Sequence, residues 1–219
     1  EDYHLKKTNI AKENGYRCIH IFDWDNQLKI LSMLRPKITI HARKCYIQEI
    51  STSTAKQFLN EYHLQGSCNG QKICFGLFHN GLIVQVMTFG NPRYNKQYEW
   101  ELLRLCTNNQ YMVVGGAERL FKAFIKKCSP SSIISYCDLA KFSGDIYYKL
   151  GFTLSHVTAP NKIWSKGVQH ITNNLLLQRG FDQLFNADFG KGTSNEQLMI
   201  EHGWLPVCDC GQGVYSWNP

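Results

Sequence analysis

The sequence lacks the features that define several large classes of protein. Only 6 of its 219 residues are proline and no stretch has low complexity, so we do not expect wholesale disorder. No apolar run approaches the roughly 18–20 residues that a membrane-spanning helix needs, and no secretory signal peptide is present. The first residue is Glu1 rather than methionine, so we expect a processed or excised piece of a longer chain.

No Cys-x-x-Cys motif occurs among the nine cysteines. An odd number of cysteines without a secretion signal predicts reduced thiols in a cytoplasmic setting. The only tight pair is Cys208-Asp209-Cys210, for which a hairpin turn is the default expectation. A zinc site usually needs two such pairs or a nearby pair of histidines, so we expect no metal.

Basic residues are in excess, with a formal net charge of +7. Small clusters occur at Lys6-Lys7, Arg43-Lys44 and Lys126-Lys127. Such a surplus suits a polyanionic partner, most simply nucleic acid, although plain solubility explains it equally well.

Apolar spacing and turn residues divide the chain into three expected segments. Residues 1–36 are expected to hold helices at Tyr3 to Asn14 and Gln27 to Leu34, with a strand at Arg17 to Phe22 between them. Residues 37–167 form the central domain. Residues 168–219 form an appendage with helices at Asn174 to Leu184 and Asn195 to His202, a hinge-like spacer at Gly190 to Gly192, and a closing strand at Val214 to Trp217.

The central segment alternates strands and helices, which predicts an α/β domain. A strand at Ile38 to Ala42 continues through Tyr46 to Ile50, and a helix capped by Ser53 or Thr54 runs to Tyr62. The later expected elements are the hairpin Lys72 to Phe89 about Asn80-Gly81, strands Glu99 to Cys106, Ser132 to Cys137 and Phe152 to His156, and helices Ala117 to Lys127 and Asp145 to Leu150.

This order, with the run from Gly144 to Phe152, resembles the GNAT acyltransferase superfamily. The resemblance implies an α/β (α+β) fold with a mixed, mainly antiparallel sheet, flanked by helices and splayed between two central strands. It also implies that the turn Val114, Gly115, Gly116 and Ala117 binds the pyrophosphate of acetyl-CoA or a related acyl donor at a helix N-terminus. Met112 stands where the family pattern has Gln or Arg.

A narrower resemblance is to the phage Mom-type proteins, which modify adenine in DNA. The segments that carry it are Tyr62 to Gly66, Thr88 to Gly90 with Pro92-Arg93, Glu101 to Leu105, Ile134 to Asp138 and Ser143 to Tyr147. This resemblance implies DNA as partner and a phage-infected bacterial cell as setting. Separately, Tyr3 to Trp24 resembles the last helix and strand of Vsr-like, homing-type nucleases, without the metal-binding carboxylates that lie upstream in those enzymes.

Four side chains are candidates for catalysis. His63 follows a predicted helix and could act as a base or bind phosphate, and a surface or core histidine is the alternative. Asp138 follows a buried strand, where it could orient a catalytic base or accept a hydrogen bond from an adenine amine, and a helix or turn cap is the alternative. Tyr136 and Tyr147 would be polar ends of a pocket, and the resemblance implies that Tyr147 or Tyr148 protonates the departing thiolate; packing is the alternative for each.

Basic residues beside aromatic ones are candidates for nucleic-acid binding. Arg93, Lys96, Arg104 and Arg43 could hold phosphates, although each could equally be a solvated surface residue. Tyr94, Tyr98 and Trp100 surround the first two of these residues, and bases stack on such rings.

The expected function is therefore a GNAT-like transferase that modifies an adenine-like nucleobase in DNA, after the base has left the stack. One alternative is a non-catalytic DNA-recognition half of a homing-type or Vsr-like endonuclease, which the departure at Met112 favours. A third is an ordinary acyltransferase acting on a small amine or a protein.

Overall fold

Two compact units make up the chain in the computed structural model, which describes residues 2–173, 175–176 and 195–219. Unit 1 comprises Glu1–Asp25, Asp138–Ser143 and Val157–Gln212, and unit 2 comprises Asn26–Cys137, Gly144–His156 and Gly213–Pro219. This division differs from the expected segments 1–36, 37–167 and 168–219, because the chain leaves unit 2 and returns to it. Most of the expected helix Asn174 to Leu184, and all of the spacer Gly190 to Gly192, lie outside the described residues.

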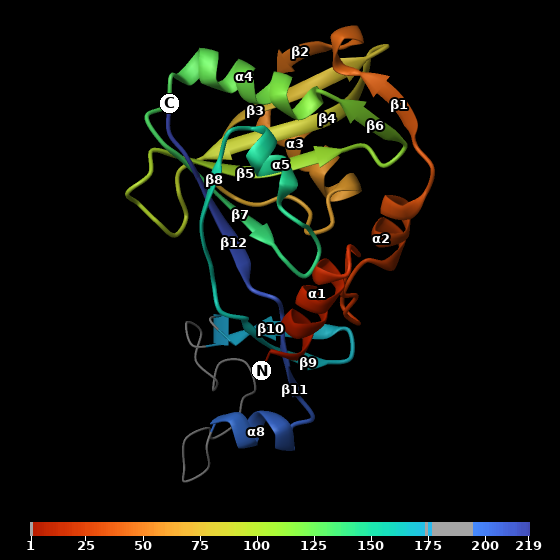
Figure 1. The fold of residues 1–219 in the computed structure, drawn as a ribbon, viewed down its shortest axis with the longest axis vertical. Helices are drawn as coiled ribbons and strands as arrows, with labels where there is room; N and C mark the ends of the chain where they lie inside the picture. Colours follow the sequence, from red (N-terminus) through yellow and green to blue (C-terminus); the bar gives the residue numbers. More distant parts are fainter. Residues whose placement is uncertain (1, 174, 177–194) are drawn as a thin grey trace. The chain divides into compact units, whose positions relative to one another are not determined.

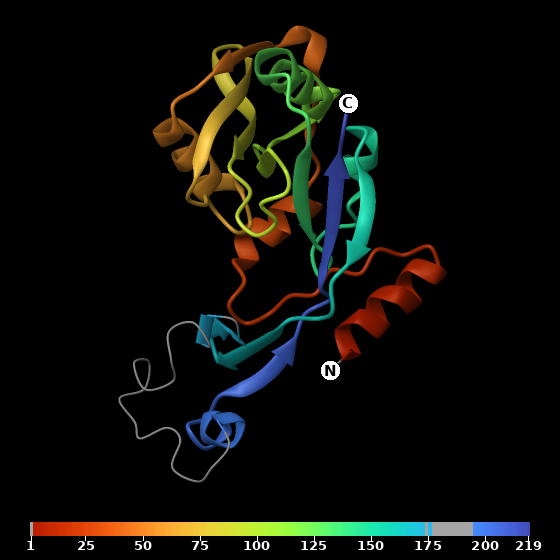
Figure 2. The ribbon, with the colours of Figure 1, turned by 90° about the vertical axis from the view of Figure 1, so that its left-hand side faces the viewer.

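Unit 2 is built on a seven-stranded sheet with the order β2-β3-β4-β5-β7-β12-β8 (Figure 1). Its strands are β2 (Tyr46–Glu49), β3 (Gln71–His79), β4 (Leu82–Gly90), β5 (Trp100–Thr107), β7 (Ile133–Asp138), β12 (Gln212–Trp217) and β8 (Thr153–Val157). The first four are antiparallel neighbours, whereas β5 and β7 are parallel. Figure 2 shows β12 between β7 and β8, so the end of the chain completes this sheet.

Helices cover both faces of the sheet in unit 2. On one face, α3 (Thr52–Tyr62) buries an apolar cluster with β3, β4 and β5 that contains Ala55, Phe58, Leu59, Cys74, Val86 and Cys106. On the other face, Phe124 of α4 (Gly116–Cys128) stacks on Phe89 of β4, with ring centroids 3.5 Å apart. The expected fold class is confirmed: the domain is α/β, with a mixed, mainly antiparallel sheet between helices.

Local sequence signals explain several of these elements. Asn80 and Gly81 both have positive φ, 49° and 78°, as the tight turn of the β3–β4 hairpin requires. The side chain of Ser51, rather than Ser53 or Thr54, caps α3 by accepting the Thr54 N–H. The expected helix Gln27 to Leu34 is α2 (Gln27–Leu34).

One expected strand continuation is wrong. Ile38–His41 forms β1, which pairs in parallel with β6 (Tyr111–Val114) in a separate two-stranded sheet. A 3-10 turn at Ala42–Lys44 then redirects the chain, and β2 joins the large sheet instead.

Unit 1 contains α1 (Tyr3–Glu13), the segment Asp138–Ser143, α8 (Asn195–Glu201) and a three-stranded sheet of order β10-β9-β11. These strands are β9 (Lys162–Lys166), β10 (Gln169–Thr172) and β11 (Leu205–Cys208). The helix α5 (Asp145–Lys149) belongs to unit 2. In the described part of the chain, no helix has the length and apolar character that crossing a membrane requires.

Two expectations for unit 1 are wrong. Arg17 to Phe22 forms no strand, because a sheet ladder needs repeated backbone bonds. The backbone bond recorded between this segment and the loop at Ala140 is the one from the His20 N–H to the Ala140 carbonyl at 3.0 Å, and side chains make the other contacts, such as Arg17 to the Lys141 carbonyl. The Cys208-Asp209-Cys210 segment is no hairpin turn, because β11 pairs with β9 whereas β12 joins the large sheet. Asp209 stabilises this crossing by accepting the N–H groups of Asn161 and Gly211.

Candidate active site

The central strands β5 and β7 separate soon after they meet. They pair only at Trp100 with Ile133 and at Glu101 with Ile134, although both strands continue for several residues. Beyond this point the Ser135 hydroxyl spans the pair by donating to the Leu102 carbonyl at 2.8 Å. The divergence leaves backbone N–H and C=O groups that are not used between the two strands, as the resemblance to the GNAT fold implies.

A bulge lies on β5 beside this opening. Thr88 of β4 is opposite Arg104, and the next residue, Phe89, is opposite Leu102, so Leu103 is an extra residue on β5. Bulges bend a strand and change the direction of its side chains, and they are common next to active sites.

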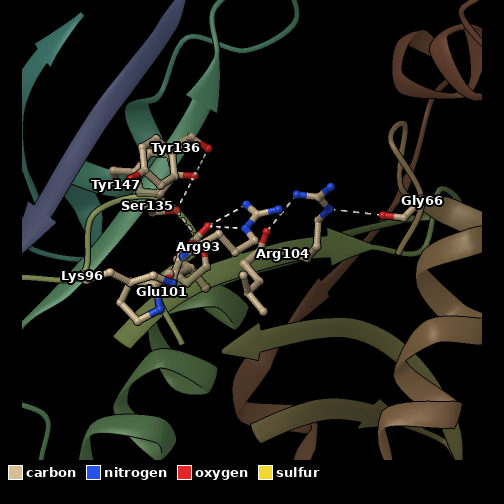
Figure 3. A network of polar contacts seen from close by, with 11 residues as sticks. Gly66, Arg93, Lys96, Glu101, Arg104, Ser135, Tyr136 and Tyr147 are labelled. Carbon is tan, nitrogen blue, oxygen red and sulfur yellow. Dashed lines mark hydrogen bonds and ion pairs between the residues drawn. The ribbon is translucent and has the colours of Figure 1, made fainter. Parts of the chain in front are cut away.

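Tyr147 lies at the same opening. Its hydroxyl is 3.0 Å from the Ser135 hydroxyl and donates to the Tyr136 carbonyl at 3.2 Å (Figure 3). Its ring stacks on Tyr215, with centroids 4.4 Å apart. Burial raises the pKa of Tyr147 to about 12. The phenol therefore stays protonated at neutral pH, where it can donate a proton but cannot act as a base.

Tyr136 is adjacent on β7 and is covered by the loop that precedes β5. Its ring meets the ring of Tyr94 edge to face, with centroids 5.5 Å apart. Burial, and then the carboxylate of Glu101, raise its pKa. The Tyr147 hydroxyl and the Tyr136 backbone carbonyl therefore lie at the same opening, and a catalytic role for either tyrosine stays a prediction.

An ion pair with a buried carboxylate joins Glu101 of β5 to Arg93 in the preceding loop, near Tyr136. Glu101 has no exposed surface, and its Oε1 accepts from the Nη2 of Arg93 at 2.6 Å and from its Nε at 2.9 Å. The Arg93 backbone N–H donates to the other carboxylate oxygen at 2.7 Å. The guanidinium of Arg93 therefore binds the carboxylate of Glu101. The negative charge of Glu101 compensates the positive charge of Arg93, which was expected to bind a DNA phosphate.

Arg104 has a different environment. Its Nε donates to the Gly66 carbonyl at 3.2 Å and its Nη1 to the Leu103 carbonyl at 3.0 Å (Figure 3). Burial lowers its pKa. Among the described residues, no Asp or Glu forms an ion pair with it. A largely buried guanidinium that contacts only carbonyl groups is suited to an anionic or electron-rich ligand.

His63 follows α3 and lies close enough to Arg104 to be affected by its charge. Burial, followed by the charges of Arg104 and Lys29, lowers the pKa of His63 to about 3. Its Nδ1 accepts the Gln65 N–H at 3.1 Å. The imidazole is therefore neutral at physiological pH, which suits hydrogen bonding and disfavours a role as general base.

The remaining candidates lie elsewhere. Asp138 belongs to unit 1, where its carboxylate accepts the Ala140 N–H at 3.0 Å and burial raises its pKa, so it has the turn-capping geometry. Lys96 donates to the Pro92 carbonyl within its own loop. Arg43 is exposed in the 3-10 turn before β2. Unit 2 therefore brings together His63, Arg93, Arg104, Tyr136 and Tyr147 as a group.

The expected cofactor turn begins α4. Gly115 has φ of 74°, which glycine adopts without strain, and a Cβ at Gly116 would collide with the side chain of Gln85. No side chain caps this helix end, so its first-turn N–H groups remain suited to an anion.

The charges around this turn fit a pyrophosphate less well. Glu118 places a carboxylate in the first turn of α4, where a helix N-terminus would otherwise attract phosphate. Arg119 is the nearest basic residue in the helix, but its Nη1 donates to the carbonyls of Ala42 and Cys45. The backbone of the turn from Gly115 to Ala117 fits a pyrophosphate, whereas the side chains of the first turn of α4 add no positive charge that is free to bind it.

Two residues at this opening, Ser135 and Glu101, were not singled out as candidates by the sequence analysis. Ser135 joins Tyr147 to β5 through the Leu102 carbonyl, and Glu101 binds Arg93, yet a serine and a glutamate inside strands give no pattern by themselves. A charged residue at an inward position of an apolar strand was the available signal for Glu101, because buried carboxylates need a partner. Among the described residues, no group of three or more His, Cys, Asp or Glu side chains is placed to hold a metal ion.

Comparison with known proteins finds similarity to solved acetyltransferase structures. No protein-family model matches the sequence, and no curated protein matches it. The structure is similar to yncA, a putative acetyltransferase from Salmonella typhimurium with acetyl-CoA (13% identity, 80% of this chain and 94% of that chain, TM-score 0.45). It is also similar to a Bacillus subtilis acetyltransferase in complex with CoA (11% identity, 80% and 98%, TM-score 0.43).

A third similar structure is the ribosomal-protein-S18-alanine N-acetyltransferase from Escherichia coli, at 15% identity and a TM-score of 0.40, covering 52% of this chain and 81% of that chain. Similarity at this level assigns neither a substrate nor a mechanism, so function has to be argued from the site.

Proposed function

We propose that unit 2 is a GNAT-like group transferase that takes an acyl-CoA-type donor and modifies a nucleobase in DNA. The observation that carries this proposal is the parallel pair β5 and β7, which separates after two paired residues and has the Tyr147 hydroxyl at the opening. Such an opening exposes strand backbone to an extended ligand with amide groups, because that ligand can pair with both strands.

The chain's own groups fit the steps of a transfer from a thioester. When an amine attacks a thioester, a C–N bond forms, the C–S bond breaks, and the proton that the nitrogen loses balances the proton that the departing thiolate gains; a donor held at this opening would supply the thioester. Tyr147 is protonated and is positioned by Ser135, so it can give a proton to a leaving thiolate. The uncapped N–H groups at Gly115 and Gly116 would hold the donor's phosphates.

A base in DNA is the proposed acceptor on three grounds. The net charge of +7 favours a polyanion. Tyr94, in the loop before β5, is 75% exposed, so a base could stack on it although its ring also meets Tyr136 edge to face. The segments that resemble Mom-type proteins include His63 and Arg104, which lie together on the α3 side of the site.

A second candidate function is DNA recognition without transfer. The observation that favours it is Glu118, whose carboxylate opposes phosphate binding at α4, together with the departure at Met112. In this case the donor turn would be a structural remnant, consistent with the proposed nuclease-associated origin of the N-terminal segment.

Two measurements on the whole chain test these functions. Calorimetry with acetyl-CoA should show binding, and nucleosides from DNA co-expressed with the chain should contain a modified adenine by mass spectrometry. Unmodified DNA with DNA binding retained would support the second candidate. If the chain binds neither acetyl-CoA nor DNA, both candidate functions are contradicted.

A further inference from the structure

Three buried polar atoms on the α3 side of the sheet have no hydrogen-bond partner among the residues that the structure describes. They are the amide nitrogen and the amide oxygen of Gln71 and the hydroxyl oxygen of Thr88. Thr88 has no exposed surface at all. Because an unsatisfied buried polar group destabilises a fold, such groups point to a ligand that completes them.

The strand register places these groups on one face. Thr88 is opposite Arg104 on β5, and Gln71 is opposite Gly90, two residues after Thr88. Side chains two apart on a strand, and those directly opposite across a pair, share a face of the sheet. The face is that of α3, since Val86, two residues before Thr88, packs against Phe58 and Leu59.

Gly90 leaves room for a segment of main chain between these side chains. A Cβ at Gly90 would collide with the carbonyl oxygen of Gly70. The loop from Leu64 to Gly70, which we call the covering loop, therefore lies directly on the sheet at this point. Its Gly66 carbonyl also accepts from Arg104.

The covering loop is attached in a way that allows it to open. Gly66 and Gly70 both have positive φ, 65° and 84°, and glycine passes between positive and negative φ readily. Hydrogen bonds that hold the loop to the rest of unit 2 include the Ser67 N–H to the side-chain oxygen of Asn60 at 2.9 Å and the Arg104 Nε to the Gly66 carbonyl at 3.2 Å.

We propose that Gln71, Thr88 and Arg104 form the recognition subsite for the acceptor base, and that the covering loop opens at Gly66 and Gly70 to admit it. This inference rests on the proposed function and names the residues that read the acceptor. A primary amide presents a donor beside an acceptor, and an adenine edge presents an amine donor beside a ring-nitrogen acceptor, so the two are complementary. Thr88 and Arg104 provide a hydroxyl and further N–H donors at the same place.

The test uses single-stranded 15-nucleotide probes and the full chain. The probes carry one adenine, one purine without the amine, or one abasic site in a thymine background, and binding is measured by fluorescence anisotropy. Wild type should prefer adenine over purine by about tenfold, the usual effect of one specific base contact. Gln71→Leu and Thr88→Val should abolish or reduce this preference while leaving affinity for the abasic probe unchanged.

Thermal unfolding gives a second readout that separates this subsite from a structural role. Leu in place of Gln71 removes two unsatisfied atoms, so the Tm should rise; a structural amide would give a lower Tm. Gln48→Leu, the same change at an exposed position of β2, is the matched control and should leave the base preference unchanged. Equal binding of adenine and purine by wild type, or an unchanged preference in Gln71→Leu, would overturn the inference.

The outcome is distinguishable from failure of the proposed function. Loss of the preference for adenine concerns only the acceptor subsite, whereas acetyl-CoA binding by calorimetry reports on the donor turn at Gly115. If Gln71→Leu still modifies DNA and still prefers adenine over purine, the proposed subsite is wrong, whereas the proposed transferase function is not contradicted.

Discussion

Protonation decides what each polar side chain of the site can do. His63 and Tyr147 both hydrogen-bond within unit 2, and burial acts on both. For the imidazole, burial disfavours the charged acid, so the neutral form persists. For the phenol, burial disfavours the charged base, so the neutral form persists as well. The site is therefore populated by neutral hydrogen-bonding groups, and proton donation falls to Tyr147.

His63 should make stability depend on pH below neutrality. Its folded-state pKa of about 3 is below the ordinary 6.5, so the unfolded chain binds a proton that the folded chain does not. Stability is then present above about pH 6.5 and is lost as the pH falls toward 3. Urea unfolding should show that wild type loses about 2 kcal/mol more than His63→Asn between pH 7 and pH 5. Equal losses would mean that His63 is protonated in the fold.

The Arg93–Glu101 pair should be sensitive to removal of one partner. Glu101→Gln removes the charge of a fully buried carboxylate that accepts three hydrogen bonds from Arg93, whose side chain is 33% exposed, so we expect a loss of about 2 kcal/mol of unfolding free energy. Glu49→Gln is the control, since it breaks the exposed Lys127–Glu49 pair and should change stability by less than about 1 kcal/mol. Denaturant titration measures both. Similar effects of the two changes would contradict a structural role for the buried pair.

Elements that are encoded locally were predictable from sequence, and those that depend on distant partners were not. The β3–β4 hairpin follows from Asn80-Gly81, and α4 follows from its apolar stripe. The pairing of β1 with β6 depends on residues about 70 positions apart, and no local pattern encodes it. The same reasoning explains the site: the tyrosines were visible as motif residues, whereas Glu101 and Gln71 gain meaning only from the strand register.

The first turn of α4 gives a prediction at the scale of one element. Glu118 opposes an anion at this helix end, and a charge in the first turn contributes about 0.3–1 kcal/mol. Glu118→Gln should therefore tighten acetyl-CoA binding about two- to fivefold by calorimetry. Glu61→Gln, at the exposed end of α3, is the control for net charge. Unchanged donor affinity in Glu118→Gln would indicate that the donor's phosphates are not held at α4.

At the scale of the whole chain, net charge and local charge have separate consequences. A charge of +7 attracts DNA from a distance. Contact with phosphates, in contrast, requires basic side chains that are exposed and uncommitted. Arg93 is bound to Glu101 and Lys96 to the Pro92 carbonyl. Arg43 is exposed as well, and among the described residues no side chain or carbonyl forms a hydrogen bond or ion pair with its guanidinium; the same turn also presents Lys44.

The salt dependence of DNA binding should therefore report on Arg43 and much less on other basic residues. Each phosphate contact contributes about 0.9 to the slope of log affinity against log salt on duplex DNA, because a counterion is released. Arg43→Ala should lower this slope by about 1 and weaken binding to all sequences alike. Lys12→Ala, in the last turn of α1, removes the same charge and should leave the slope unchanged. Equal reductions by both substitutions would mean that DNA responds to net charge alone, and that the turn before β2 is no phosphate contact.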